Sequence, residues 1–328
     1  MALPRGEKNC ITDVEGVKVG HVTLYEKLEE QEVICTGVTA ILPHGGNLFQ
    51  EKVPAGCAVL NGFGKSIGLV QVKELGRIES PIMLTNTNSV GAVYHGTLQY
   101  LLKENNDIGD ETSTVNIVVG ECNDGYLNSI RHLAIKPEHA IEAIEKATAE
   151  PAEEGAVGAG KGMVAFGYKG GIGTSSRIVS MDGETFTVGC LVLSNYGKPE
   201  HALFANLEQK PKNAPEGSIM IILATDAPLY DRQLTRLARR AAAGLGRTGS
   251  ILENGSGDIA IAFSTKNRSP HYPQGAVETL AYVRDDHPIM NKLFQAVVET
   301  TEEAVIRSLK EAETTEGRLG RVVEKAPL

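Results

Sequence analysis

A serine between two glycines carries the strongest chemical signal in this sequence. Ser256 lies in the segment Glu253-Asn254-Gly255-Ser256-Gly257-Asp258, directly before the apolar run Ile259-Ala260-Ile261-Ala262-Phe263. The Gly-rich segment is typical of a turn, and the apolar run is typical of a buried strand. Because glycine adopts backbone angles that other residues avoid, the Ser256 hydroxyl has room to approach the carbonyl carbon of Gly255.

Attack of this hydroxyl on Gly255 would break the bond between the two residues and make Ser256 a new N-terminus. Its α-amine, with a pKa near ~8, would then lie beside the hydroxyl of the same residue. An adjacent amine activates a hydroxyl that is otherwise a weak nucleophile. The alternative is that this segment is an ordinary turn without a catalytic role, because Asn, Gly and Ser are common in turns.

Polar side chains elsewhere in the chain are candidates to complete such a site. Tyr126 and Asn195 follow apolar runs, and a phenol and a carboxamide are suitable donors to a developing oxyanion. In the last expected helix, Thr300 and Glu302 lie close to an apolar stripe, where a carboxylate could hold a protonated α-amine. The alternative is that Tyr126 and Asn195 only form turns, and that Thr300 and Glu302 only belong to a solvated helix face.

Other kinds of site have weaker support. Residues 155–162 approach the phosphate-loop pattern, but Gly162 stands where a hydroxyl should bind Mg²⁺, so we expect no nucleotide there. The eight histidines and five cysteines show no metal-binding spacing, so we expect no metal, no cofactor and no disulfide framework. Ser256 precedes its strand, unlike the serine of a G-x-S-x-G elbow. A Ser-His-Asp triad stays open, although no histidine is singled out.

The composition restricts the partners and the compartment. The chain of 328 residues is 41% hydrophobic and has a formal net charge of −9. An acidic chain without long basic runs is not expected to bind nucleic acid or an anionic membrane. The sequence shows neither the apolar core of a signal peptide nor a stretch long enough to span a bilayer, so we expect a soluble, cytoplasmic protein.

The pattern of apolar runs and turn residues predicts a sheet-rich α/β protein with one domain, residues 1–328. Strands are expected at 38–42, 81–87, 114–122, 163–168, 185–193, 219–225, 259–263 and 280–283, with a hairpin within 11–23. Helices are expected at 92–104, 137–149, 231–245 and 288–311, with a short helix capped by Ser66. Residues 169–177 are interpreted as flexible backbone near a site, and residues 198–216 as an exposed loop.

Several short motifs, taken in order, resemble the L-aminopeptidase/D-esterase family of self-processing serine hydrolases, which includes β-peptidyl aminopeptidases. The resemblance covers nearly the whole chain. Its main motifs are Gly16-Val17-Lys18-Val19-Gly20-His21, Asn61-Gly62-Phe63-Gly64, Thr85-Asn86-Thr87-Asn88-Ser89, Asp124-Gly125-Tyr126-Leu127-Asn128, Lys169-Gly170-Gly171-Ile172-Gly173-Thr174, Ala224-Thr225-Asp226-Ala227-Pro228 and Gly255-Ser256-Gly257-Asp258. Phe166 stands where the family often has tyrosine, and we interpret it as a core residue.

The resemblance implies a four-layer α/β/β/α sandwich that cuts itself between Gly255 and Ser256 into residues 1–255 and 256–328. It also implies that Ser256 is the nucleophile, with Tyr126, Asn195, Thr300 and Glu302 as the best matches to the supporting groups. The expected activity is release of N-terminal residues from short peptides, amides or esters, by a homotetramer of processed units. Two alternatives remain: an acyl transferase that uses the same serine, and a binding or scaffold protein without catalysis.

Overall fold

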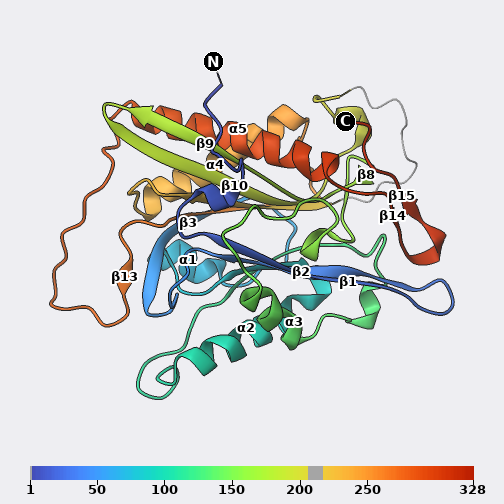
Figure 1. Ribbon diagram of the computed structural model, residues 1–328, viewed down its shortest axis with the longest axis horizontal. Helices are drawn as coiled ribbons and strands as arrows, with labels where there is room; N and C mark the ends of the chain where they lie inside the picture. Colours follow the sequence, from blue (N-terminus) through green and yellow to red (C-terminus); the bar gives the residue numbers. More distant parts are fainter. Residues whose placement is uncertain (1, 206–216) are drawn as a thin grey trace.

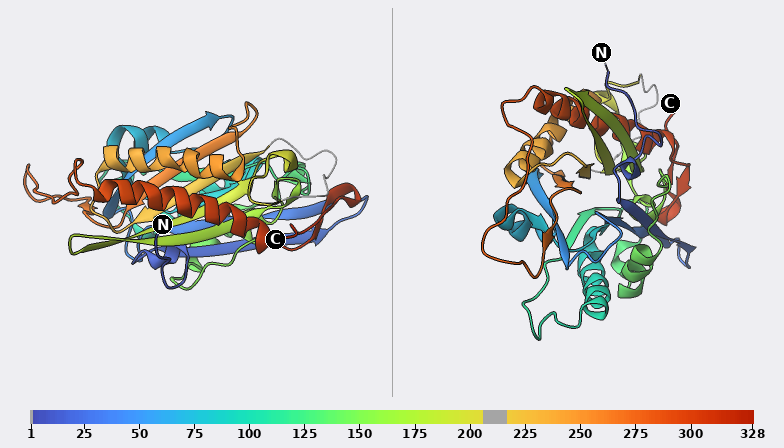
Figure 2. Two further views of the ribbon diagram at one scale, coloured as in Figure 1. Left: turned by 90° about the horizontal axis from the view of Figure 1, so that it is seen from above. Right: turned by 60° about the vertical axis from the view of Figure 1, so that its left-hand side comes forward.

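Two β-sheets packed face to face form the centre of the protein, and helices cover the outer face of each sheet (Figure 1). The computed structural model describes residues 2–205 and 217–328. Figure 2 shows the same layers from two other directions, with the two sheets between the two groups of helices. The expected four-layer α/β/β/α sandwich with a single domain is therefore confirmed.

The smaller sheet has the strand order β1-β2-β5-β6. Its strands are β1 (Lys18–Lys27), β2 (Val33–Leu42), β5 (Ile82–Asn86) and β6 (Val118–Cys122). The helices α2 (Val90–Glu104) and α3 (Pro137–Glu145) pack against it through one apolar cluster that includes Val38, Val93 and Ala140. Pro137 opens α3 as expected, because its missing N–H would have no partner in the first helical turn.

The larger sheet has the strand order β13-β3-β12-β11-β10-β9, and β4 pairs with β3 beside this path. Its strands are β3 (Glu51–Gly62), β4 (Arg77–Ile78), β9 (Gly171–Met181), β10 (Glu184–Asn195), β11 (Ser218–Thr225), β12 (Gly257–Ser264) and β13 (Ser269–Pro270). The helices α4 (Asp231–Thr248) and α5 (Ile289–Lys310) cover its outer face. Short elements complete the chain: α1 (Leu69–Leu75), the pair β7 (Val164–Ala165) and β8 (Tyr168–Lys169), and the pair β14 (Thr315–Glu316) and β15 (Val322–Val323).

The core between the two sheets is apolar and fully buried. Ile41 and Leu84 of the smaller sheet meet Leu191, Ile222 and Ile261 of the larger sheet in one cluster. A second cluster lies between the larger sheet and the helices α4 and α5. Alternate residues of β12 therefore face opposite sides, which is the expected pattern for a strand inside a sandwich.

Several expectations about single elements were wrong. Residues 171–181 form the long strand β9, because they pair with β10 over their whole length, and are not a flexible segment. Residues 280–283 form no strand. The expected hairpin at 11–23 is instead a 3₁₀ helix, Ile11–Asp13, followed by β1, which pairs with β2. The N-cap of α1 is Gly68 and not Ser66.

One expected segment lies only partly within the described residues, and another consists of two short strands. The exposed loop expected at 198–216 contains the 3₁₀ helix Pro199–His201, while 206–216 lie outside the described residues. The single strand expected at 163–168 is the short antiparallel pair β7 and β8. Phe166 lies in the turn between them and is fully buried, so its interpretation as a core residue is confirmed.

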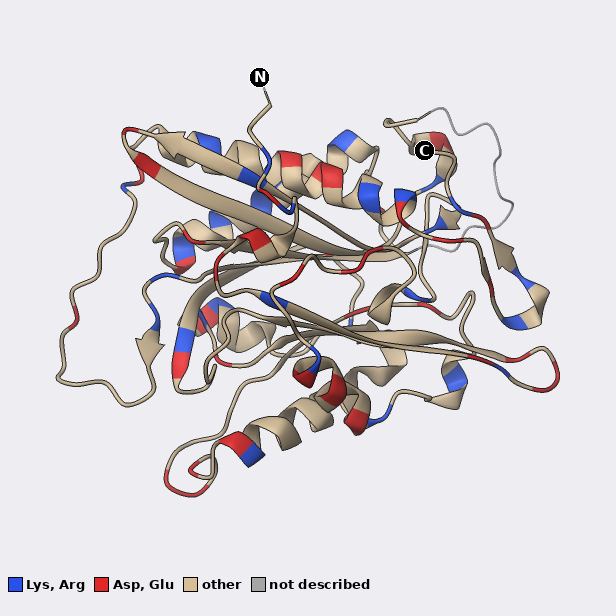
Figure 3. Ribbon diagram, viewed as in Figure 1, with Lys and Arg blue, Asp and Glu red and all other residues tan. Residues whose placement is uncertain are grey.

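Both signs of charge occur along α5 (Figure 3), whose charged residues are Lys292 near the start, Glu299, Glu302 and Glu303 in the middle, and Arg307 and Lys310 near the end. Arg177 on β9 makes ion pairs with Glu299 and Glu303 on this helix. Within 2–205 and 217–328, no helix is long and apolar enough to cross a membrane.

A buried lysine fixes the segment that leads into β9. The Lys169 Nζ donates to the carbonyl oxygens of Gly160, Met163 and Gly170 at 2.9, 2.8 and 2.7 Å. Burial lowers the pKa of Lys169 to about 7. Three carbonyl acceptors around one ammonium hold the glycine-rich chain in a single conformation, since a buried carbonyl without a donor is costly.

We expect Lys169→Met to lower the free energy of unfolding by about 3 kcal/mol, because the three buried carbonyls lose a charged donor. Urea denaturation followed by circular dichroism measures this loss. The control is Lys73→Met on the exposed side of α1, which should change the value by less than about 0.5 kcal/mol. Equal stability of Lys169→Met and the control would show that the lysine does not hold this segment.

Candidate active site

Ser256 immediately precedes β12, the strand that lies between β3 and β11 in the larger sheet. Ser256 is 5% exposed, and its Oγ donates to Oδ1 of Asp258 at 2.5 Å. Asp258 pairs with Ile219, whose side chain belongs to the core under α4 and α5. The serine hydroxyl therefore lies on the helix-facing side of the larger sheet.

The peptide bond between Gly255 and Ser256 belongs to a tight turn. The Ser256 N–H donates to the carbonyl oxygen of Glu253 at 2.9 Å, which closes the turn. The side-chain amide of Asn61, at the end of β3, donates to the carbonyl oxygens of Glu253 and Asn254 at 2.9 and 3.2 Å. The same amide also contacts the carbonyl oxygen of Ser256. Asn61 thus holds the backbone on both sides of Gly255.

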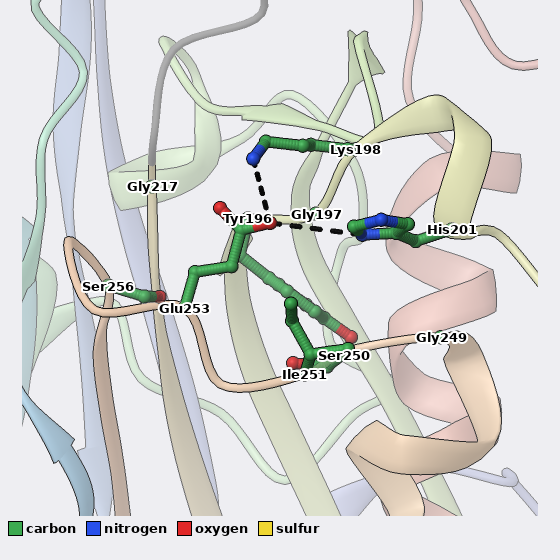
Figure 4. A pocket seen from close by; sticks show the side chains of 10 residues that line it. All are labelled: Tyr196, Gly197, Lys198, His201, Gly217, Gly249, Ser250, Ile251, Glu253 and Ser256. Atoms are coloured by element: carbon green, nitrogen blue, oxygen red, sulfur yellow. Dashed lines mark ion pairs between the residues drawn. The ribbon is translucent and has the colours of Figure 1, made fainter.

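A small cavity lies beside Ser256 (Figure 4). Its walls come from the end of β10 and the following loop, from the end of α4, and from the segment that precedes Ser256: Tyr196, Gly197, Lys198, His201, Gly217, Gly249, Ser250, Ile251, Glu253 and Ser256. Its accessible volume is about 20 Å³. A cavity of this size holds about one water molecule, so it has no room for an amino-acid side chain.

The carboxylate of Glu253 is the acidic group in the wall of this cavity. Its Oε1 lies 3.0 Å from Nζ of Lys198 and 3.8 Å from Nδ1 of His201. Figure 4 shows Glu253 directed toward these two side chains, with Ser256 farther along the same loop. The ion pairs fasten the segment before Ser256 to the loop after β10.

The carboxyl group of Asp258 is unusually basic for an aspartate. Burial raises its pKa to about 6, although the hydrogen bond from Ser256 acts in the opposite direction and Glu253 adds to the rise. Its second oxygen, Oδ2, is buried and has no hydrogen-bond partner among the residues that the structure describes. A buried carboxylate with one free oxygen next to a hydroxyl is a suitable acceptor for the hydroxyl proton.

Asn195 lies at the same end of the larger sheet as Ser256, but its side chain faces the other way. It pairs with Ser218 of β11, whose Oγ accepts from the Gly257 N–H at 3.1 Å. The Asn195 amide accepts from the Val164 N–H at 2.9 Å and donates to the Asn123 carbonyl at 3.0 Å. It therefore connects β10 to the loops between the two sheets.

Tyr126 lies in the loop after β6 and does not line the cavity. Its ring packs against the apolar cluster of Val33, Cys35, Leu127, Val164 and Val323, and the Arg321 guanidinium lies 4.5 Å from the ring centroid. The start of this loop is near Asn195, because the Asn123 carbonyl oxygen accepts a hydrogen bond from the Asn195 amide. Tyr126 and Asn195 are thus placed on the inter-sheet side, away from the Ser256 hydroxyl.

Thr300 and Glu302 are not brought to the cavity either. The Thr300 hydroxyl donates to the carbonyl oxygens of Ala296 and Val297 within α5. The Glu302 carboxylate is partly exposed and pairs with Arg247 of α4 at 3.1 Å. In this structure both residues contribute to the packing of α5 against its surroundings.

Asp258 and Asn61 are two residues in direct contact with Ser256 or its turn that the sequence did not single out. Asp258 has a signal in the sequence, because residues i and i+2 of a strand lie on the same face. The position of Asn61 has no comparable signal, since it depends on the antiparallel pairing of β3 with β12. No group of three or more His, Cys, Asp or Glu residues suited to a metal ion occurs in the part of the chain that the structure describes.

Comparisons with known proteins agree on one family. The model of peptidase family S58 matches residues 9–323. The β-peptidyl aminopeptidase BapA of Sphingosinicella microcystinivorans is 40% identical over 348 aligned residues, which cover 98% of this chain and 86% of that protein. The PH0078 protein from Pyrococcus horikoshii OT3 superimposes with a TM-score of 0.93 at 52% identity, covering 100% of this chain and 93% of the other.

A third relative is known by its fold as well as its activity. The L-aminopeptidase D-Ala-esterase/amidase of Ochrobactrum anthropi, called a variant of the Ntn hydrolase fold, superimposes with a TM-score of 0.92 at 34% identity. The match covers 99% of this chain and 93% of that one. The resemblance seen in the sequence is therefore confirmed: this chain has that fold, is a hydrolase, and belongs to peptidase family S58.

Proposed function

We propose that this chain is a self-processing serine aminopeptidase that cuts its own bond between Gly255 and Ser256. The mature enzyme then releases N-terminal residues from short peptides, amino-acid amides or esters through an acyl-enzyme on Ser256. The observation that carries the proposal is the placement of a buried serine hydroxyl beside a carboxylate, within a turn whose flanking carbonyls are held by Asn61. The names of the relatives, β-peptidyl aminopeptidase and L-aminopeptidase, support the class of substrate.

The size of the cavity favours cleavage as a step before catalysis. In the intact chain the space beside Ser256 is about 20 Å³, and Ser250, Ile251 and Glu253 form part of its wall. All three belong to the segment that would end in a free carboxylate after cleavage. Movement of this segment would enlarge the cavity and uncover the new N-terminus of residue 256.

Cleavage would not release the smaller piece, residues 256–328. Its strand β12 is hydrogen-bonded to β3 on one side and to β11 on the other, and both of these strands belong to residues 1–255. Its helix α5 packs on β9, β10 and α4. The two pieces therefore share one core and stay together.

In the mature enzyme the freed α-amine of Ser256 acts as the base for its own hydroxyl. The Asn195 amide uses one of its two hydrogens for the Asn123 carbonyl and keeps the other for an oxyanion. We propose Asn195 and the Tyr126 hydroxyl as the donors to this oxyanion once the Ser256 side chain has turned toward the inter-sheet side. Thr300 and Glu302 take no part in this proposal, because their contacts are within α5 and with Arg247.

Intact-mass analysis tests the cleavage. We expect the purified wild-type protein to contain residues 1–255 and 256–328 as two polypeptides, and Ser256→Ala to remain one chain. Hydrolysis of aminoacyl p-nitroanilides with β-, L- and D-residues should fall at least ~10⁴-fold in this variant, because the nucleophile is lost.

The matched control is Ser264→Ala, a serine at the opposite end of the same strand whose Oγ donates to the Ala227 carbonyl. We expect this variant to be cut and to remain active. A wild-type chain that stays uncut after long incubation and still hydrolyses the anilides would contradict the proposal.

The role of Asn195 can be separated from its contribution to the fold. We expect Asn195→Ala to lower the free energy of unfolding by about 1–3 kcal/mol, because the buried Val164 N–H loses its acceptor. In cleaved protein, kcat should also fall ~10²-fold or more with a smaller change in KM, as for loss of an oxyanion donor. Asn195→Asp keeps the acceptor but not the donor, so a kcat close to wild type in Asn195→Asp would limit Asn195 to the fold.

We also propose that the processed units assemble into a homotetramer. Exposed apolar side chains at the end of β3 and on α1 support an interface there: Val59, Phe63, Val70 and Leu75. Light scattering of the cleaved protein should give four times the mass of one unit, and Val70→Glu should lower that mass. A wild-type mass equal to one unit would contradict the assembly.

A further inference from the structure

Self-cleavage needs a base other than the α-amine that serves the mature enzyme. Before the bond between Gly255 and Ser256 is cut, the nitrogen of Ser256 is an amide whose N–H donates to the Glu253 carbonyl. An amide nitrogen does not accept a proton at neutral pH, so it cannot activate the hydroxyl of the same residue. The base of the mature enzyme is therefore the product of the cleavage and cannot promote it.

Asp258 occupies the position that such a base requires. Its Oδ1 lies 2.5 Å from the Ser256 Oγ, within direct reach of the proton. Asp258 is 1% exposed, so bulk water does not compete for this hydrogen bond. Its Oδ2 is buried without a hydrogen-bond partner in 2–205 and 217–328, which leaves one carboxylate oxygen for a second proton contact.

We propose that Asp258 is the general base and acid of self-cleavage: it takes the hydroxyl proton of Ser256 and returns it to the departing nitrogen. This inference rests on the proposed function, because it assumes that Ser256 attacks Gly255. It adds a catalytic residue for the first cut, whereas the freed α-amine serves every later turnover.

The proton and the electron pairs balance in three steps. The Ser256 Oγ forms a bond to the carbonyl carbon of Gly255 while its proton passes to Asp258. The bond from that carbon to the Ser256 nitrogen then breaks, and Asp258 returns the proton to the nitrogen, which becomes the free α-amine. Water finally hydrolyses the ester between Gly255 and the Ser256 Oγ, which gives a carboxylate on Gly255 and restores the hydroxyl.

Asn61 is a positioning residue for this reaction. Its amide binds the carbonyl oxygens of Glu253, Asn254 and Ser256, which lie before and after the carbonyl of Gly255. These contacts restrict the movement of the Gly255 carbonyl, because the residues before and after it are held. Asn61 and Asp258 are neighbours across the β3–β12 pairing, so one register places both groups.

The surroundings of Asp258 suit a base at neutral pH. Burial raises its pKa to about 6, so the carboxylate is mostly ionised at pH 7 and still basic enough to hold a proton briefly. The titratable groups that interact electrostatically with Asp258 are Glu253 from the preceding turn, Tyr196 from the end of β10 and, from the other side of the sheet, Cys122 of β6. Burial raises the pKa of Tyr196 and of Cys122 far above 7, which leaves both neutral.

The test follows cleavage of freshly made chains. Wild type, Asp258→Asn and Asp226→Asn are produced by cell-free synthesis with a short radioactive pulse, and the uncut chain is followed on gels during a chase at pH 5–8. We expect Asp258→Asn to be cut ~10²–10⁴-fold more slowly, the usual range for loss of a general base. Asp226→Asn is the matched control, because Asp226 is a partly buried aspartate with a raised pKa next to the opposite end of the sheet, and should be cut at the wild-type rate.

The pH profile gives a second readout. Below pH 6 the wild-type cleavage rate should rise about tenfold per pH unit, because the ionised fraction of Asp258 rises in proportion, and it should level off above pH 6. In Asp258→Asn this step should disappear. A wild-type profile without the step would overturn the assignment.

Replacement of the nucleophile separates a base from a structural residue. A thiol ionises without help at high pH, with an ordinary pKa of about 8.5. Asp258→Asn reduces the cleavage rate by some factor in each background. At pH 8.5 this factor should be at least ~10-fold smaller with Ser256→Cys than in the serine protein. An equal loss in both backgrounds would make Asp258 a structural residue and overturn the proposal.

The two proposals fail in different ways. If Asp258→Asn is cut within twofold of the wild-type rate, Asp258 is not the base, and self-cleavage at Ser256 still stands. If the wild-type chain itself is never cut, the proposed function fails first. Circular dichroism of Asp258→Asn checks that the uncut chain is folded.

Discussion

The hydrogen bonding of β12 between β3 and β11 is the constraint on which the site depends. Because β12 is an interior strand of the larger sheet, the residue just before it is fixed in space from both sides. This placement buries the Ser256 hydroxyl against Asp258, and it brings the Asn61 amide to the turn that contains Gly255. The same pairing would keep the two pieces of a cleaved chain in one core. A strand at the edge of the sheet would provide neither effect.

Burial decides the electrostatics around this strand end. Asp258 is removed from water and lies near a second carboxylate, Glu253, so its pKa rises toward neutrality. Glu253 instead pairs with Lys198 and His201 at the wall of the cavity. The two carboxyl groups thus have different properties although they are five residues apart in the chain. Glu253 holds the turn to the neighbouring loop, and Asp258 accepts the hydrogen bond of the serine hydroxyl.

The two faces of the larger sheet divide the polar groups into separate sets. On the helix-facing side are Ser256, Asp258 and the small cavity. On the inter-sheet side, Asn195 connects β10 to the loops that carry Asn123 and Val164. The chain therefore holds its proposed nucleophile and its proposed oxyanion donors on opposite faces. This arrangement fits a precursor that must break a bond before its site is complete.

The fold class, the α-helices, several of the strands and the family could be read from the sequence, because apolar periodicity and ordered glycine-rich motifs are local properties of the chain. The long strand β3, which carries Asn61, was not among the expected strands. The sequence also pointed to Ser256, since a serine between glycines before an apolar run is visible without a structure. It could not show that 171–181 form a strand or that 280–283 do not, because pairing with β10 and not residue type decides that. Only the tertiary structure placed Asn61 beside the turn and turned Glu302 toward Arg247, because these contacts join segments 195 and 55 residues apart. Such contacts depend on strand register and helix rotation, for which one sequence contains no local signal.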